Sequence, residues 1–161
     1  MKPKKILVPL DGSSLAAAAI ETAIDLAAGP FSLVLMRAAE AHVLPGADPT
    51  DMQVTVVREA EEYLASVRED LAKRGITDVE TTVWYGAAPR AIIDGARLQK
   101  ADLIVMSSHG RSGLGRLILG SVAESVLRGT TVPVCIVRVP GAPLETAHGE
   151  AIPGRGQVSH V

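Results

Sequence analysis

The chain has 161 residues, of which 47% are hydrophobic, 21% charged and only 2% aromatic. This length and composition suit one domain whose core is built from Val, Ile, Leu and Ala, as in a parallel sheet covered by helices. The net charge of −2, without a long run of Lys or Arg, argues against nucleic acid as the main partner. No apolar run is long enough to span a membrane. We expect no targeting segment either, because the apolar run at residues 6–10 is too short for one.

The single cysteine, Cys135, lies within an apolar run. An intrachain disulfide is therefore excluded, and the surroundings predict a buried, inert thiol. A free buried thiol is typical of a reducing compartment. We therefore expect a cytoplasmic protein.

Short apolar runs alternate with helical patterns along the chain. We expect strands at residues 6–10, 32–37, 79–83, 103–106 and 132–137, and helices at residues 14–28, 51–74, from about 89, and 121–128. The helix after the first strand carries a stripe of mostly small residues, formed by Leu15, Ala19, Ala23, Leu26 and Ala27, and the next helix carries Val54, Val57, Leu64, Val67 and Leu71 at helical spacing. Polar residues alternate with Val79 and Val83, which places that strand at a sheet edge.

This order of elements predicts right-handed crossovers and a single doubly wound parallel α/β sheet with helices on both faces. We assign residues 1–140 to this domain. Residues 141–161 contain several Pro and Gly without periodicity, so we expect a flexible C-terminal tail.

The main functional signal is the glycine-rich loop after the fourth strand. Residues 107–123 include four glycines and no acidic residue, while Arg111 and Arg116 supply positive charge. Ser121 and Glu124 have the spacing of a capping box at the start of the next helix. Backbone amides at such a helix start bind phosphate. A simple turn remains open as the alternative, and neither the Walker sequence nor the dinucleotide fingerprint is present.

Asp11 follows the first strand directly. In a doubly wound sheet, ligands bind beyond the carboxyl ends of the strands, so Asp11 faces the glycine loop if the first and fourth strands are neighbours. Asp11 would then hold a ribose hydroxyl or a Mg²⁺ ion bridged to phosphates. Capping of the first helix is the structural alternative.

Three motifs together carry a family resemblance. They are the start Ile6-Leu-Val-Pro-Leu-Asp-Gly-Ser, the pattern Ser107-x-x-Gly110 followed by nine residues and Gly120-Ser121, and the Val-Pro-Val of the last strand. Over residues 3–139 the chain resembles the universal stress proteins, in particular their ATP-binding branch. The resemblance implies a five-stranded sheet of order 3-2-1-4-5 and an adenine nucleotide, ATP with Mg²⁺, as the ligand.

The resemblance also implies which residues would contact the nucleotide. The positions that match or adjoin the family's site are Pro9, Asp11, Ala38, Met106, Ser107, Gly110, Arg111, Gly113, Gly120, Ser121 and Val122. Asp11 is the residue that would reach the metal of Mg-ATP. The ATP-binding branch has glycine where this chain has Ser107, and a serine there either crowds the ribose or points away from it.

Residues 132–139 form an apolar strand that is an edge strand in this fold. An open apolar edge favours pairing, and family members that resemble this chain form homodimers there. Shielding of this edge by the tail is the alternative.

Three functions fit the sequence. The first is an ATP-binding regulatory dimer of the stress response, and the second is a nucleotide-independent interaction protein. The third is a slow ATP hydrolase or phosphotransferase. We assign no catalytic residue, because His109 is the one candidate general base and a lone loop histidine is a weak one.

Overall fold

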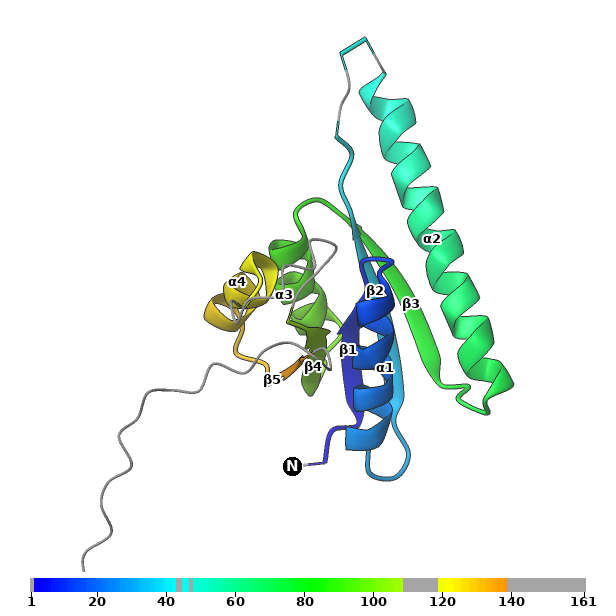
Figure 1. Cartoon of the computed structure of the whole chain (residues 1–161), viewed down its shortest axis with the longest axis vertical. Coiled ribbons are helices and arrows are strands. Elements are labelled where there is room, and N and C mark those ends of the chain that lie inside the picture. The colour runs from blue at the N-terminus through cyan, green and yellow to red at the C-terminus, as the bar shows by residue number, and fades with distance from the viewer. Residues whose placement is uncertain (1, 43–44, 47, 109–118, 139–161) are drawn as a thin grey trace, which may run out of the picture.

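The computed structural model describes residues 2–42, 45–46, 48–108 and 119–138. Within these ranges the chain alternates strands and helices (Figure 1). The elements are β1 (Lys5–Pro9), α1 (Ser14–Leu26), β2 (Ser32–Ala39), α2 (Pro49–Lys73), β3 (Val79–Tyr85), α3 (Ala88–Leu98), β4 (Leu103–Ser107), α4 (Ser121–Gly129) and β5 (Val134–Val137).

The strands form one parallel sheet in the order β3-β2-β1-β4-β5. This confirms the strand order that the family resemblance implied, and it confirms that β3 is an edge strand. The register places Leu7 opposite Val34 of β2 and Ile104 of β4. β1 is therefore the central strand, with a neighbour on each side.

Two hydrophobic clusters fill the two faces of the sheet, because alternate residues of each strand point to opposite faces. Ile6 and Val8 pack with residues of α1 and α2, whereas Leu7 packs with residues of α3 and α4. All three β1 side chains are fully buried. The sheet therefore has helices on both faces, as the sequence predicted.

The predicted buried stripe of α1 was partly wrong. Ala19 and Ala23 are buried as expected, but the other fully covered positions are Ala16 and Ile20, and Leu26 is 43% exposed. The helix ends at Leu26 because Ala27 is already extended, so the last turn does not continue over the sheet. This leaves the Leu26 side chain at the margin of the core.

α2 is the longest helix and has a defined cap at each end. Asp48 is the N-cap, and its Oδ1 accepts a hydrogen bond of 2.8 Å from the Thr50 N–H. At the other end Gly75 has φ +84°, and the Gly75 and Ile76 N–H groups donate to carbonyls of the last turn, as in a Schellman motif. The 25 residues of α2 extend about 37 Å at 1.5 Å per residue.

The sheet is shorter than α2, so the N-terminal turns of the helix project beyond the end of β2 (Figure 1). β2 has eight residues and extends only about 26 Å at 3.3 Å per residue. Val54 was predicted to face the core, but it is 61% exposed, because it lies beyond the sheet and on the opposite side of the helix from the half-buried Met52 and Val56. Leu64 and Leu71, further along the same stripe, are buried as predicted.

Asp102 joins the beginnings of β1 and β4. Its Oδ2 accepts hydrogen bonds from the backbone N–H groups of Lys4 and Lys5, at 3.0 and 2.9 Å. The bond from Lys5, followed by that from Lys4, lowers the pKa of the Asp102 carboxyl. The ionised carboxylate therefore stabilises the folded state.

We predict that Asp102→Asn lowers the free energy of unfolding at pH 7 and has a smaller effect at pH 3. A carboxyl whose pKa is lowered on folding stabilises the protein above its unfolded pKa, near the usual 3.8. That contribution is lost as the pH falls through the lower pKa of the folded state. Urea unfolding of both proteins at the two pH values measures the difference. An equal loss at both pH values would contradict this role of the charge.

Candidate functional site

The candidate site lies at the carboxyl edge of the sheet, where β1 and β4 end side by side. Leu7 pairs with Ile104, so Pro9 and Met106, two residues further along, end at the same level. β1 continues into α1 on one face of the sheet, while β4 leads toward α4 on the other. This divergence of neighbouring connections marks the topological switch point, beside which doubly wound proteins bind ligands.

Asp11 shapes the turn between β1 and α1. Its Oδ1 accepts a hydrogen bond of 2.9 Å from the Ser13 N–H, and Gly12 between them has φ +85°. The N-cap of α1 is Ser13, so the alternative that Asp11 caps this helix was wrong. Through this Asx-type hydrogen bond, Asp11 stabilises the turn that precedes α1.

The Ser13 side chain has an unsatisfied group in this turn. Its Oγ is buried and makes no hydrogen bond with the part of the chain that the structure describes. It does not cap α1, although Ser13 occupies the N-cap position. Buried hydroxyls normally make a hydrogen bond, so the Ser13 Oγ is able to bind a further partner.

Arg37 and Tyr63 complete the surroundings of this turn, and neither was predicted from the sequence. The Arg37 guanidinium carbon lies 4.9 Å from the centroid of the Tyr63 ring. A Cβ atom placed on Gly12 would lie 3.5 Å from an Arg37 guanidinium nitrogen. Burial raises the pKa of Tyr63, the Arg37 charge opposes this, and Asp11 adds to it. Arg37 therefore brings a positive charge from β2 to the Asp11 turn.

Backbone hydrogen bonds hold the two ends of the glycine-rich loop together. The Ser108 N–H donates to the Val137 carbonyl at 2.9 Å, and the Ser108 carbonyl accepts from the Gly120 N–H at 2.8 Å. Ser108 is only 7% exposed. The end of β4 is thereby fixed to β5 and to the start of α4.

The predicted capping box of α4 was wrong. Gly120, not Ser121, is the N-cap, and as a glycine it offers no side chain to cap the helix. Ser121 is already the first residue of the helix, so Ser121 and Glu124 both lie one residue too far into the helix for the reciprocal bonds. Glu124 instead binds Arg128 at 2.7 Å. The first amides of α4 thus remain without a side-chain cap, which leaves them suited to an anion.

The other predicted site residues divide into two groups. Ala38 lies at the end of β2 in register with Trp84, Ser107 is the last residue of β4, and Val122 is half-buried in the first turn of α4. Gly110, Arg111 and Gly113 lie outside the described residues. The described members lie at the ends of strands or at the start of a helix, on the carboxyl edge of the sheet.

The described residues contain no group of three or more metal-ligating side chains. Asp11 therefore belongs to no such group among them. This fits Mg²⁺, which proteins commonly hold through one or two carboxylates together with the phosphates of a substrate. In the same part of the chain, no helix is both long enough and apolar enough to cross a membrane.

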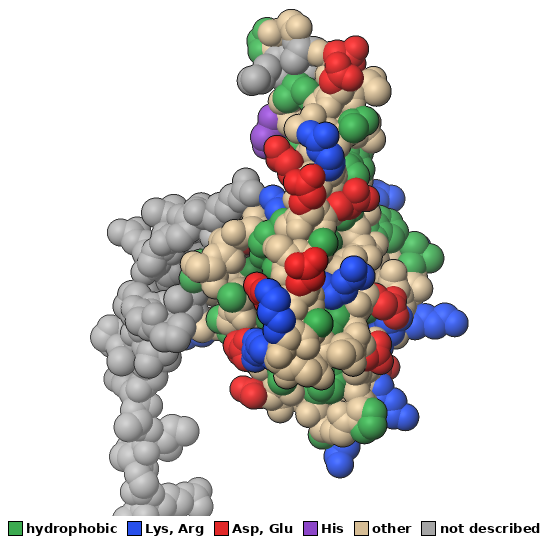
Figure 2. Space-filling model, turned by 90° about the vertical axis from the view of Figure 1, so that its right-hand side faces the viewer, with side chains coloured by type: hydrophobic (Ala, Val, Ile, Leu, Met, Phe, Trp, Pro, Cys, Tyr) green, Lys and Arg blue, Asp and Glu red, His purple; other side chains and the backbone are tan. Residues whose placement is uncertain are grey.

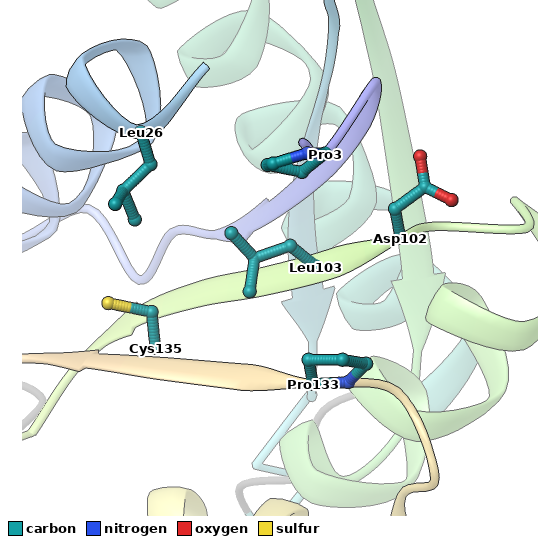
Figure 3. A pocket seen from close by; sticks show the side chains of 6 residues that line it. All are labelled: Pro3, Leu26, Asp102, Leu103, Pro133 and Cys135. Atoms are coloured by element: carbon teal, nitrogen blue, oxygen red, sulfur yellow. The ribbon is translucent and has the colours of Figure 1, made fainter. Parts of the chain in front are cut away.

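An apolar pocket of about 350 Å³ lies at the opposite edge, where the strands begin (Figure 3). Its lining consists of Pro3, Leu26, Asp102, Leu103, Pro133 and Cys135. The prediction of a buried Cys135 was wrong, because this side chain is only partly buried. β5 is an edge strand, and the Cys135 thiol lines the pocket together with Leu26 at the end of α1.

The strand order, the crevice between β1 and β4 and the uncapped start of α4 define an α/β protein of the Rossmann-like class. Residues 2–138 match the model of the universal stress protein family. A universal stress protein of Methanocaldococcus jannaschii is 32% identical over 142 residues, which are 85% of this chain and 83% of that protein. The chain therefore belongs to the universal stress protein family.

Solved structures agree with this assignment. One is a universal stress protein in complex with cAMP, which has 24% identity and a TM-score of 0.59 and covers 85% of this chain and 98% of its own. Another is an Arabidopsis thaliana family member with AMP bound, which has 16% identity and a TM-score of 0.60 and covers 84% of this chain and 92% of its own. At these identities the likeness establishes the fold.

We predict that Gly12→Ala lowers the free energy of unfolding by about 1–2 kcal/mol, the cost of a left-handed conformation for an L-residue. The nearest atoms to the added Cβ are 3.5 Å away, so the cost arises from the backbone and not from a clash. Gly12→Asn is the control and should lose less, since Asn tolerates this region better. Urea unfolding measures both, and an alanine variant as stable as the parent would contradict the prediction.

Proposed function

We propose that this chain is a cytoplasmic, ATP-binding regulatory protein of the stress response that works as a homodimer. ATP would bind at the carboxyl edge of the sheet, with its phosphates at the start of α4 and its adenosine toward Pro9 and Ala38. Asp11 would contact the ribose or a Mg²⁺ ion on the phosphates. Nucleotide binding would then alter the surface that a partner protein meets.

The observation that carries this proposal is the hydrogen bonding that joins the two ends of the glycine-rich loop. The Gly120 to Ser108 hydrogen bond holds the start of α4 beside the end of β4, and Asp11 lies at the end of the neighbouring strand. Uncapped amides attract phosphate, while a carboxylate suits a hydroxyl or a cation. The relatives solved with cAMP and with AMP support an adenine nucleotide as the ligand class.

Ser107 favours a second candidate, a nucleotide-independent interaction protein. It ends β4 and pairs with Val137, so this residue lies at the carboxyl edge of the sheet. A serine there adds an obstacle that the glycine of the ATP-binding branch does not. We propose no catalytic step, and His109 lies outside the described residues.

The homodimer would form through strand 132–139. All four residues of β5 are half-buried, and β5 has a partner strand on one side only. The Pro133 and Val137 carbonyls accept from β4, so the N–H and C=O groups of Val134 and Ile136 point to the open edge. Two copies related by a two-fold axis could pair these groups.

For ATP binding, we predict that calorimetry of the nucleotide-free protein with Mg-ATP gives saturable binding, and that Gly120→Val weakens it at least about tenfold, or 1.4 kcal/mol. The added side chain would cover the first amides of α4, while φ −59° and ψ 150° at this position are acceptable for valine. Ser125→Val is the matched control, because it enlarges an exposed residue further along the same helix. Unaltered affinity in Gly120→Val would contradict the phosphate site.

Ser107→Gly distinguishes the two candidate functions. If the folded parent protein binds no ATP at millimolar concentration but this variant does, Ser107 closes the site and the nucleotide-independent function is favoured.

Phosphate release, measured in the same samples, reports any hydrolysis. Nucleotide released from freshly purified, denatured protein identifies the natural ligand.

For the dimer, we predict that Ile136→Pro yields monomers, whereas Ile136→Ala leaves the dimer intact. Proline removes an N–H that points to the open edge and leaves the bonds between β4 and β5 in place. Alanine shortens the same side chain but keeps that N–H. Sedimentation velocity at micromolar concentration measures both, and a monomeric parent protein would rule out this dimer.

A further inference from the structure

The N-terminal turns of α2, together with the N-cap, form a projection that we call the α2 arm, residues 48–59. Its helical part begins at Pro49, and the first buried residue of α2 is Ala60. The arm stands beyond the carboxyl edge of the sheet in Figure 1 and rises above the body of the molecule in Figure 2. It therefore contributes little to the core, although it carries apolar residues.

A groove of about 400 Å³ runs along one side of the arm. Its lining consists of Asp48, Asp51, Met52, Thr55, Val56 and Glu59. These positions recur every three or four residues and so share one side of the helix. Met52 and Val56 are half-buried, whereas the three acidic residues are exposed. The groove thus combines an apolar stripe with negative charge.

Helix stability accounts for two of these carboxylates but not for the third. Asp48 caps the helix and Asp51 lies in its first turn, where negative charge favours the helix dipole. Glu59 lies in the third turn, beyond the reach of this effect. The ion pairs of α2, such as Arg58 with Glu62, use other carboxylates. Within the part of the chain that the structure describes, Glu59 therefore has no evident structural role beside the apolar stripe.

We propose that the α2 arm is a docking surface for a basic amphipathic helix of a partner protein. Met52 and Val56 would receive its apolar face, and Asp48, Asp51 and Glu59 would attract its Lys and Arg side chains. A second copy of this chain fits less well, because its own arm carries the same negative groove.

The position of the groove determines which part of the molecule a docked partner would lie beside. Tyr63 lies one turn beyond Glu59 on the same side of α2, and Arg37 covers its ring beside the Asp11 turn. A helix in the groove would therefore lie next to the carboxyl edge of the sheet. The proposal stands on the arm itself and does not require nucleotide binding.

The test is a fluorescence anisotropy titration of the full chain with a labelled synthetic helix of about 18 residues, with Leu on one face and Lys on the other. We expect a dissociation constant of about 1–100 μM, in the range of transient contacts, weakened about tenfold or more by Glu59→Lys and by Val56→Ser. A scrambled peptide of the same composition should bind more weakly, because it has no apolar face.

Matched controls lie on the far side of the same arm or just beyond it. Glu61→Lys and Val54→Ser make the same chemical changes two residues away, about 200° around the helix, at exposed positions. Each should leave the affinity within about twofold of the parent value, since these side chains do not line the groove. Circular dichroism establishes that all four variants keep the helix content of the parent protein.

Three outcomes would overturn the proposal. Equal weakening by Glu59→Lys and Glu61→Lys would mean that net charge alone attracts the peptide. Equal affinity for the scrambled peptide, or no binding of either peptide, would mean that the groove does not recognise an amphipathic helix. Self-association that the groove variants abolish, without peptide binding, would assign the groove to a second copy of this chain.

Discussion

The structure depends on the position of β1 between β2 and β4. Its residues Ile6, Leu7 and Val8 are fully buried because both faces of the sheet are covered by helices and both edges of the strand are paired. A strand in this position is held from all sides, so its end is fixed in space. The turn at Asp11, the crevice beside β4 and the approach of Arg37 all follow from where β1 ends.

The sequence was sufficient for the type and order of the elements but not for contacts set by one or two residues. Alternating apolar runs predicted all five strands, and the motifs around Asp11 and Gly120 led to the strand order through the family resemblance. The capping box failed because the helix starts one residue earlier than its pattern requires, which makes Gly120 the N-cap. A local pattern does not fix that register, since it depends on the bond between Gly120 and Ser108.

Burial along helices was predictable only where the sheet lies beneath them. Leu64 and Val54 belong to the same helical pattern, yet the first is buried and the second is exposed because β2 ends before α2 does. The contact of Arg37 with Tyr63 was missed for a related reason. It joins residues from two elements whose relative position only the packed structure defines. Site residues contributed by side-chain packing are therefore harder to find than those contributed by backbone motifs.

Trp84 gives this protein an optical property that follows from its place in the sheet. It is the single tryptophan of the chain, it lies in register with Ala38, and its indole packs near Gly95 and Met36. Indole emission depends on the polarity and exposure of the ring, and this ring is half-buried at the carboxyl end of an edge strand. The intrinsic fluorescence of the unmodified chain therefore reports on the neighbourhood of Ala38, without any attached label.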